Sequence, residues 1–347
     1  MHQPPERLLE HLRNVGARTT LLGAAPSFLQ AIAPLERLAT SDATVLISGE
    51  TGTGKELVAR ALHYLGPRRS WPFVPVNAGA LPDTLLESEL FGHERGAFTD
   101  AQLRKSGLVA QAEHGTLFLD EVEALSNRGQ VALLRVLQDK TFRPLGSIRE
   151  QHTDVRFIAA TNVRLDALVH EGRFRPDLYY RLCVFTIALP RLRDRREDIL
   201  ILAEHFVDKH RLPQHAASEL TAEARVTLVA YDWPGNVREL ENAIIRGIYV
   251  SAGKVIDVDD LGVPPGPPGP IDVTSDRTQS FTTLKRKVIT AFERDYLTRL
   301  LAEHRGNVTH AARIAGQERR TLGKLLKKHH IDPNLYRAQV AGHSLAG

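Results

Sequence analysis

The sequence has very little cysteine and no long hydrophobic run. Cys183 is the only cysteine among 347 residues, so no disulfide bond can form within the chain. It lies in the apolar run 182–187, where we expect it to pack as a small hydrophobic residue in a buried strand. No apolar stretch is long enough to span a membrane, and the first residues lack the pattern of a signal peptide. We therefore expect a cytoplasmic protein without a membrane partner.

The overall composition is that of an ordinary globular protein, with 42% hydrophobic and 25% charged residues. A chain of this length suggests two or three domains. The charge is unevenly distributed: residues 281–330 contain twelve Lys or Arg and four Asp or Glu, whereas the whole chain has a net charge of +4. Such a basic segment indicates a polyanionic partner, although a solvated basic surface is the alternative interpretation.

The order of sequence patterns predicts several domains and no internal repeats. β-like segments alternate with helical patterns and predict an α/β domain with a mostly parallel sheet; they cover residues 44–48, 72–77, 115–120, 155–161 and 184–189. A purely helical pattern follows, and then a Pro/Gly-rich segment that can form neither a helix nor a central strand. We expect an extension over 1–20, the α/β domain over 21–195, a helical subdomain over 196–261, a linker over 262–280, a further domain over 281–331 and a tail over 332–347.

A glycine-rich segment stands between the first predicted strand and a helical pattern. Its residues are Gly49, Glu50, Thr51, Gly52, Thr53, Gly54, Lys55 and Glu56. The apolar positions of the helix that follows are Leu57, Val58, Ala61, Leu62 and Leu65. In such a loop, backbone N–H groups converge on phosphate oxygens and the lysine reaches the outer phosphates, so the segment predicts binding of a nucleoside triphosphate. Glu56 stands where most such loops carry a Ser or Thr hydroxyl for magnesium.

Two carboxylates, Asp120 and Glu121, end the apolar β run that begins at Gly115. A strand that delivers an acidic pair to its carboxyl end can hold hydrated Mg²⁺ and polarise an attacking water. We expect Asp120 to serve the metal and Glu121 to be the general base, whereas a solvated acidic pair is the plainer alternative. The two motifs together predict an ATPase that uses ATP and Mg²⁺.

The basic segment contains three helical patterns, over about 282–303, 308–315 and 318–328. Asn307 or Thr309 can cap the second helix, and Gly316 lies between the second and the third. The expected apolar seam is Ala311, Ala312, Ile314, Leu322, Leu325 and Leu326. The last helix carries Arg319, Arg320, Thr321, Lys324, Lys327 and Lys328. This is typical of a helix-turn-helix whose last helix enters the major groove of double-stranded DNA; a small three-helix dimerisation bundle is the alternative.

From about Leu22 to Leu261, and again over 282–331, the chain resembles the bacterial enhancer-binding proteins. These are AAA+ activators of sigma-54 RNA polymerase with a Fis-type helix-turn-helix. Their phosphate loop reads G-E-[ST]-G-T-G-K-E, so the resemblance makes Glu56 a family trait. The segment 89–101 is similar to the family's surface loop, G-A-F-T-G-A, and implies contacts to sigma-54 by Gly96, Ala97, Phe98, Thr99, Asp100 and Ala101.

Phe98 and Thr99 are the expected principal contacts of this loop, because an exposed aromatic residue at a loop tip usually meets a partner. Asp100 replaces the second glycine of the family pattern. The replacement adds a negative charge and restricts the backbone beside the contact residues.

The resemblance also implies roles for further polar residues. Asn77 would hold Glu121 until the γ-phosphate is sensed, although a simple turn-forming role is the alternative. Thr161 and Asn162, at the end of a predicted strand, would form the sensor between the acidic motifs. Arg238, in the stretch that begins with Trp-Pro-Gly-Asn-Val, would sense the nucleotide bound to its own subunit.

Two arginines, Arg175 and Arg181, match the segment that supplies arginine fingers in this family. They would reach the γ-phosphate of a neighbouring subunit, whereas surface ion pairing is the default for isolated arginines. Action between subunits implies a ring of identical chains, and we expect a hexamer.

The sequence thus predicts an ATP-hydrolysing activator that binds upstream DNA and remodels closed complexes of the sigma-54 RNA polymerase holoenzyme into open ones. A DNA-binding regulator with nucleotide-dependent assembly, acting without sigma-54, is the alternative, and Asp100 keeps it open. About twenty residues precede the ATPase region, too few for a receiver or sensor domain. We expect any regulation to act in trans, through a partner protein or the expression level, unless the sequence is truncated.

Overall fold

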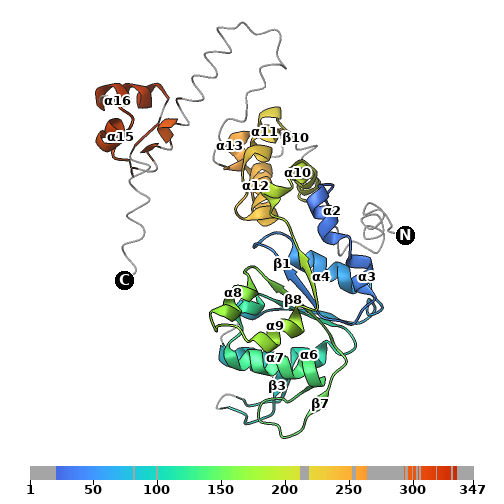
Figure 1. Cartoon of the computed structure of the whole chain (residues 1–347). Helices are drawn as coiled ribbons and strands as arrows, with labels where there is room; N and C mark the ends of the chain where they lie inside the picture. Colours follow the sequence, from blue (N-terminus) through green and yellow to red (C-terminus); the bar gives the residue numbers. More distant parts are fainter. Residues whose placement is uncertain are drawn as a thin grey trace. The chain divides into compact units, whose positions relative to one another are not determined.

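The computed structural model describes residues 21–80, 83–98, 101–211, 219–251, 255–263, 293, 296–298, 300–301, 304, 306–317, 319–329 and 331–333. The chain forms two compact units, residues 1–262 and 263–347 (Figure 1). The division falls at the start of the segment predicted as a linker. The predicted extension over 1–20, most of the linker and of the helix over 282–303, and the tail from 334 onward lie outside the described residues.

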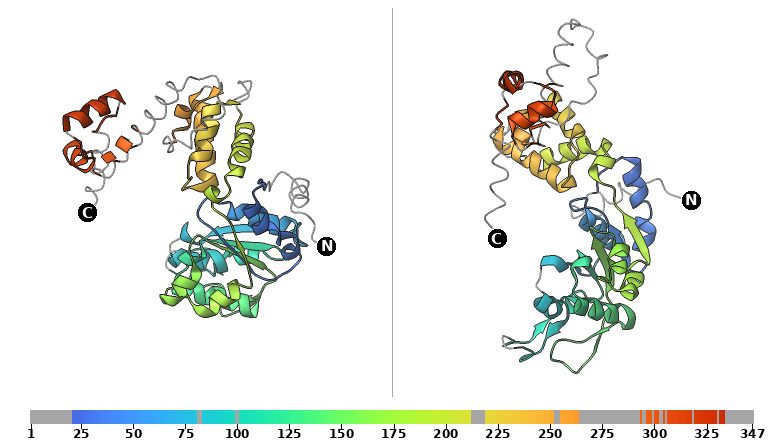
Figure 2. Two further views of the ribbon diagram at one scale, coloured as in Figure 1. Left: turned by 45° about the horizontal axis from the view of Figure 1, so that its top comes forward. Right: turned by 60° about the vertical axis from the view of Figure 1, so that its left-hand side comes forward.

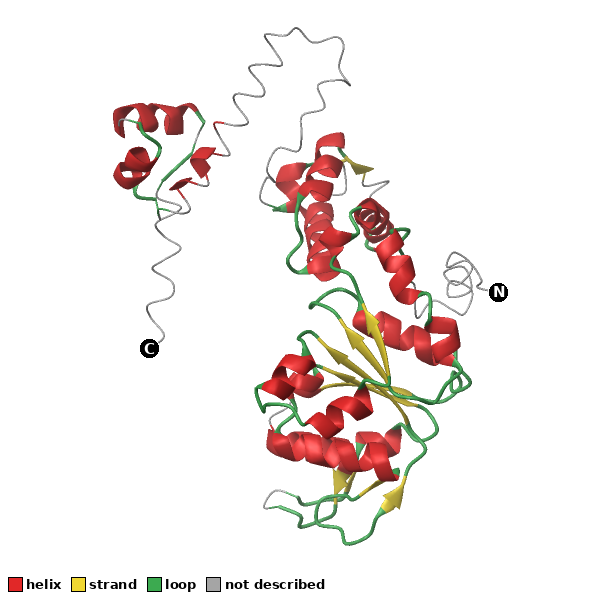
Figure 3. Ribbon diagram, in the orientation of Figure 1, coloured by secondary structure: helices red, strands yellow, loops and turns green. Residues whose placement is uncertain are grey.

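A five-stranded sheet forms the centre of the first unit (Figure 3). Its strands are β1 (Val45–Ser48), β2 (Phe73–Asn77), β5 (Thr116–Asp120), β8 (Arg156–Thr161) and β9 (Phe185–Ala188). All neighbours are parallel, in the order β2-β5-β8-β1-β9, which confirms the predicted fold class. Ser48 pairs with Thr161 and Asn77 pairs with Asp120, so polar strand ends share one edge of the sheet.

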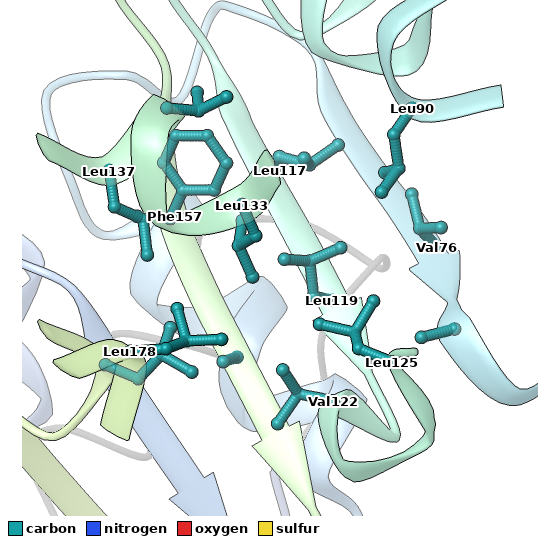
Figure 4. Close-up of a cluster of buried hydrophobic side chains, with 14 of the residues drawn as sticks. Val76, Leu90, Leu117, Leu119, Val122, Leu125, Leu133, Leu137, Phe157 and Leu178 are labelled. Atoms are coloured by element: carbon teal, nitrogen blue, oxygen red, sulfur yellow. The ribbon is translucent and has the colours of Figure 1, made fainter. Parts of the chain in front are cut away.

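Helices cover both faces of the sheet. One face carries α2 (Pro26–Ile32), α3 (Leu35–Ala39) and α4 (Lys55–Tyr64). The other carries α5 (Asp83–Phe91), α6 (Leu108–Gln111), α7 (Asn127–Asp139), α8 (Leu165–His170) and α9 (Pro176–Leu182). Successive strand residues point to opposite faces: Phe118 packs in the first core, while Leu117 and Leu119 pack in the second. Figure 4 shows Leu117 and Leu119 in this second core. The three central strands β1, β5 and β8 are therefore buried on both sides, as a doubly covered parallel sheet requires, whereas the edge strands β2 and β9 are more exposed.

Two short hairpins and three short helices interrupt this pattern. The hairpins are β3 (Gly92–His93) with β4 (Lys105–Ser106), and β6 (Thr141–Phe142) with β7 (Gln151–His152). The 3₁₀ helices are η1 (Ala78–Ala80), η2 (Val122–Ala124) and η3 (Leu192–Asp194). The connection from β3 to β4 carries Phe98, so this loop projects from the α/β body between α5 and α6.

The helical subdomain follows the sheet and lies at one end of it, as the two views of Figure 2 show in yellow-green to orange. Its helices are α10 (Glu197–Lys209), α11 (Ala222–Ala230), α12 (Asn236–Val250) and α13 (Val258–Leu261). The prediction of a purely helical region was wrong in one respect, because β10 (Glu219–Leu220) and β11 (Val255–Ile256) form a small parallel pair. Two-residue strands carry no periodic signal, so only the packing of α11 and α13 reveals them.

The second unit contains α15 (Val308–Ile314) and α16 (Arg319–Lys328), joined by a turn in which Gly316 has φ +62°. The Asn307 side chain accepts a hydrogen bond from the N–H of His310 and caps α15. The hydrophobic core of this second unit contains Leu297, Leu300, Leu301, Ala311, Ala312, Leu322 and Leu326. The expectation for Ile314 was wrong: its side chain is 57% exposed, because the last turn of this short helix has rotated the residue away from α16.

The environment of Cys183 also differs from the prediction. Cys183 follows the last residue of α9 and is half-buried, and β9 begins only at Phe185. Cys183 does pack against the hydrophobic core as a small apolar residue, as predicted, but it is not part of a strand. Burial raises the pKa of its thiol, which disfavours the reactive thiolate. Among the described residues, no helix has both the length and the apolar character that crossing a bilayer requires.

Candidate functional site

The glycine-rich segment forms the turn between β1 and α4. Gly52 and Gly54 have φ values of +80° and +102°, a region that strains residues with a side chain. A Cβ atom on Gly52 would also lie 2.2 Å from the carbonyl oxygen of Gly235. The glycines therefore allow both the left-handed turn and the close approach of the helical subdomain, and α4 begins directly after them at Lys55.

Lys55 is the first residue of α4 and is only 8% exposed. Its Nζ donates to the carbonyl oxygens of Gly49 (2.8 Å) and Glu50 (3.2 Å). Burial lowers the pKa of Lys55, and the carboxylates of Asp120 and other acidic residues partly oppose this effect. The ammonium group is thus held over the loop, where phosphate oxygens would replace carbonyl partners.

The residues after Lys55 face outward to a greater extent than the helical pattern suggested. Glu56 forms a surface ion pair with Arg60, with 2.7 Å between Nη2 of the arginine and Oε1 of the glutamate. Leu57 was expected on the apolar face of the helix, yet its side chain is 39% exposed. Leu57 lines the same pocket as Lys55 and Asp120, which explains why this apolar residue remains outside the core.

The acidic pair lies where β5 leaves the sheet. Asp120 is its last residue, and its Oδ1 accepts from the N–H of Glu121 at 3.0 Å. Glu121 has φ +55°, an unfavourable backbone conformation of the kind that concentrates at functional sites. The Oδ1 of Asn77, at the end of the adjacent β2, accepts from the N–H groups of Gly79 (2.8 Å) and Ala80 (3.0 Å).

A pocket of about 650 Å³ brings most of these predicted residues together. Its polar lining contains Thr51, Gly52, Thr53, Gly54, Lys55, Glu56, Asn77, Asp120, Glu121 and Arg238. Gly49 and Glu50 do not line it, and the Glu50 carboxylate instead contacts Arg191 (3.0 Å from Nε to Oε1). The loop, the acidic pair and the subdomain arginine therefore share one cavity, as a phosphate-binding and phosphate-cleaving site requires.

The sensor candidates lie beside this pocket and not in its lining. Thr161 is buried, and its carbonyl oxygen accepts from the N–H of Gly49 at 3.2 Å. The N–H of Asn162 donates to Oε1 of Glu123 at 3.3 Å, while the other carboxylate oxygen of Glu123 is buried and has no hydrogen-bond partner within the described part of the chain. Glu123 was missed from the sequence, although it lies two residues after the acidic pair.

The two candidate arginine fingers are exposed and do not line the pocket. Arg175 forms a bidentate pair with Asp177, at 3.1 and 2.7 Å. Arg181 donates to the carbonyl oxygen of Leu137 at 3.3–3.4 Å. Neither arginine contacts the phosphate loop of its own chain, so any role in catalysis requires a second protomer.

The apolar end of the pocket was not predicted from the sequence. It is lined by Leu21, Leu22, Phe28, Leu202 and Phe206. Two buried charged residues support it. Oδ1 of Asp198 accepts from the N–H groups of Ala24 (2.6 Å) and Ala25 (2.9 Å), and Arg195 donates to the carbonyl oxygen of Thr53 at 3.2 Å. These contacts join residues far apart in sequence, and the sequence pattern gives no sign of them.

The Phe98 loop folds back on the β3–β4 hairpin. The Phe98 ring packs edge-on against His93, with ring centroids 4.9 Å apart, and remains 38% exposed. Gly96 has φ +80° and donates its N–H to the carbonyl oxygen of Ala101, while Ala97 packs against Gly146. Ala101 is only 4% exposed, so its side chain is part of the base of the loop and not of its accessible surface. Thr99 and Asp100 lie outside the described residues.

The candidate DNA interface lies on α16. Its exposed side chains are Arg319, Arg320, Thr321, Lys324, Lys327 and Lys328. Lys328 forms an ion pair with Glu293 at 2.7 Å, and an exposed basic helix face of this kind can contact DNA phosphates. Thr309 is exposed on α15, and Asn307 caps that helix.

A parallel sheet in the order β2-β5-β8-β1-β9, with a phosphate loop after β1, an acidic pair after β5 and a helical lid, defines an AAA+ P-loop ATPase. Comparison with known families supports the ATPase assignment for the first unit and identifies the C-terminal part as a separate domain. Residues 21–188 match the Sigma-54 interaction domain, residues 193–264 the AAA+ ATPase lid domain, and residues 288–329 the bacterial regulatory proteins of the Fis family.

Individual relatives agree with this assignment. The chain is 43% identical to the regulatory protein AtoC of Escherichia coli K12 over 317 residues, which cover 90% of this chain and 68% of AtoC. It is 41% identical to the transcriptional regulatory protein ZraR of Salmonella typhi over 326 residues, 91% of this chain and 72% of ZraR. The crystal structure of NtrX from Brucella abortus in complex with ATP is similar, with a TM-score of 0.68 and 32% identity over 93% of this chain and 72% of NtrX.

The chain belongs to the sigma-54-dependent transcriptional activators, which combine an AAA+ ATPase with a Fis-type DNA-binding domain. It is an ATP-binding ATPase with a helix-turn-helix for DNA and an interaction domain for sigma-54.

Proposed function

We propose that this protein hydrolyses ATP to convert closed complexes of sigma-54 RNA polymerase into open complexes while its C-terminal domain holds upstream double-stranded DNA. One observation carries the proposal. The pocket with Lys55, Asp120 and Glu121 and the loop with Phe98 belong to one compact unit, inside the region that matches the Sigma-54 interaction domain. The action takes place in the cytoplasm, where the promoter DNA lies.

The hydrolytic step follows from the residues that line the pocket. Lys55 neutralises charge on the outer phosphates, and Glu121 takes the proton of the attacking water. Mg²⁺ fits this residue set, because Asp120 supplies a carboxylate in the pocket while Glu56, the residue after the lysine, is paired with Arg60. Asp120 would hold the ion through water, and the ion would supply charge neutralisation at the phosphates.

The contacts of Asn77 link the pocket to the Phe98 loop. Asn77 caps η1 through Gly79 and Ala80, and a Cβ on Gly79 would lie 2.3 Å from Oε2 of Glu121. A displacement of Glu121 on loss of the γ-phosphate would therefore push on η1. From η1 the chain continues directly into α5 and β3, which carry the loop. Hydrolysis changes the position of Phe98 because the two nucleotide states contact Asn77 and Glu121 differently.

The exposed positions of Arg175 and Arg181 support a ring in which each site is completed by its neighbour, and we propose a hexamer. Arg175 would exchange its partner Asp177 for the γ-phosphate of the next protomer. ATP turnover per mole of protein should then rise steeply with protein concentration across the assembly range. A turnover that does not depend on concentration would contradict the shared site.

Transcription in vitro tests the proposed function directly. The unaltered protein, ATP and sigma-54 holoenzyme should give open complexes on a supercoiled template, and a nonhydrolysable ATP analogue should not. Phe98→Ala should abolish open complexes while retaining ATP turnover. Tyr249→Ala, which removes an aromatic ring that is 65% exposed on α12, is the matched control and should remain active. DNA binding and ATP turnover without any open complex would favour the regulator that acts without sigma-54.

A further inference from the structure

Asn236, the first residue of α12, has an unusual backbone and no exposure to solvent. It follows the turn formed by Trp233, Pro234 and Gly235, and its φ is +54°. Asparagine is tolerated in the left-handed region better than most residues, but the conformation is still unfavourable. Its side chain is completely buried, at 0% exposure. A buried polar residue on a strained backbone needs specific partners to persist.

These partners are in the phosphate loop. Nδ2 of Asn236 donates to the carbonyl oxygen of Thr51 (3.0 Å) and to Oε2 of Glu50 (3.2 Å). Its Oδ1 accepts from the N–H of Leu192 at 2.8 Å. A carboxamide can donate and accept at once from one planar group, whereas a carboxylate of the same shape only accepts. The contacts therefore require asparagine at this position and not aspartate.

The neighbouring backbone extends the same junction. The N–H of Val237 donates to the carbonyl oxygen of Gly52 at 3.0 Å. Together with the Asn236 contacts, this attaches three successive loop residues to the start of α12. A Cβ on Gly52 would lie 3.2 Å from Cβ of Arg238, so Arg238 itself packs directly against the loop. The distance between the loop and Arg238 is set at this junction.

The Glu50 side chain completes the junction from the loop side. Its Oε1 pairs with Nε of Arg191 at 3.0 Å, and its Oε2 accepts from Asn236. A carboxylate that pointed at bound phosphates would repel them, and these two partners hold it away from the pocket. Glu50 is thus an anchor for the loop and not a ligand for the nucleotide.

We propose that Asn236 is a positioning residue for ATP binding and hydrolysis. Its carboxamide holds the phosphate loop against the lid, so that Arg238 stays aimed at the phosphate end of the pocket. The lid cannot move away from the loop without breaking these hydrogen bonds, so lid position and loop geometry change together. The inference rests on the assignment of this pocket as the ATP site and adds the residue that connects its two walls.

Asn236→Asp in the full-length protein is the main test. The substitution keeps the shape and the acceptor for Leu192, but it removes the donor and places a second carboxylate about 3.2 Å from Glu50. We expect the KM for ATP to rise at least tenfold. Glu50→Gln in the same chain should recover at least threefold of that loss, because the new carboxamide can donate to the new carboxylate. Asn242→Asp makes the same chemical change at an exposed position of α12 and should leave the KM within twofold.

A second variant separates positioning from folding. Asn236→Gly relieves the left-handed backbone and keeps the contact of Val237, yet it has no carboxamide. We expect a folded protein by circular dichroism with an ATP KM raised at least fivefold. The proposal is wrong if Asn236→Gly is folded and binds ATP normally, or if the effects of Asn236→Asp and Glu50→Gln on KM simply multiply. Failure of the unaltered protein to hydrolyse ATP would instead overturn the assignment of the site.

Discussion

The buried contact of Asp198 with the start of the described chain allows a quantitative prediction. Asp198 lies in the first turn of α10 and is 0% exposed. Its Oδ2 is 3.9 Å from Nη1 of Arg195. The Arg195 side chain is 3% exposed, and its guanidinium carbon lies over the ring of Phe28, 4.7 Å from the ring centroid. Burial lowers the pKa of the Arg195 guanidinium, and Asp198 partly opposes this. Asp198→Asn keeps an oxygen acceptor for Ala24 and Ala25 but leaves Arg195 as an uncompensated buried charge.

The size of the effect can be worked out from these contacts. Removing one member of a buried ion pair costs about 3–5 kcal/mol. The distance of 3.9 Å is long for an ion pair and the backbone contacts can persist, so we expect a loss of about 3 kcal/mol. For a unit of this size, 1 kcal/mol shifts Tm by about 2–4 °C, which gives a decrease of about 6–12 °C. Because Leu21 and Leu22 line the ATP pocket and directly precede the segment that Asp198 holds, the KM for ATP should also rise severalfold.

Tryptophan fluorescence during heating is the appropriate assay. Both tryptophans of the chain, Trp71 and Trp233, lie in the first unit, so their signal reports the unfolding of that unit alone. Asp208→Asn is the matched control, since Asp208 pairs with Arg211 at the surface and its side chain is 70% exposed. A surface pair contributes about 0–1 kcal/mol, so this control should lower Tm by at most about 4 °C. Equal shifts for the two variants would refute the reasoning.

Three further results are expected. Glu121→Gln should bind ATP with an affinity within a few-fold of that of the unaltered protein, but should hydrolyse it at least about 100-fold more slowly, because the amide cannot take a proton. An unchanged rate of phosphate release would exclude Glu121 as the general base. Burial lowers the pKa of His63 from 6.5 to about 4, so the unfolded chain binds the proton more readily than the folded chain does. The free energy of unfolding should therefore be highest above pH 6.5 and fall by up to about 3 kcal/mol as the pH drops to 4. His63→Gln can keep the hydrogen bond to Thr116 but does not titrate. In urea titrations, the difference in unfolding free energy between the unaltered protein and this variant should narrow from pH 7 to pH 4.5. If the two unfolding free energies change in parallel with pH, His63 does not cause the loss. Arg320→Ala should weaken DNA binding and reduce the slope of log K against log salt by about 1, whereas Arg211→Ala, in the other unit, should change neither.

Much of the fold was predictable because it depends on local patterns. Apolar runs that alternate with helical periods define a parallel sheet covered on both faces, and the strand predictions fell within one residue of β1, β2, β5, β8 and β9. The phosphate loop was predictable for a similar reason, since consecutive residues and the strand before them specify its backbone. The DNA-binding helix was likewise predictable from its basic residues and from the glycine in the turn before it.

Predictions failed where a neighbouring element decides the environment. Ile314 continues the apolar pattern of α15, yet α16 covers only the other side of that short helix, so Ile314 is exposed. Cys183 continues an apolar run, yet α9 ends just before it and the strand begins two residues later. Ala101 belongs to the expected contact loop by sequence, but the return of the chain into β4 buries it.

The sequence by itself determined the class of protein, because phosphate binding, acidic chemistry and DNA binding each reside in a short continuous stretch. Only the tertiary structure decided which residues join those stretches. Asn236 reaches a loop 185 residues earlier in the chain, and Asp198 binds backbone groups 174 residues before it. Such pairs leave no periodic or spacing signal in one sequence, since the sheet and the lid must first fold to bring them within hydrogen-bonding distance.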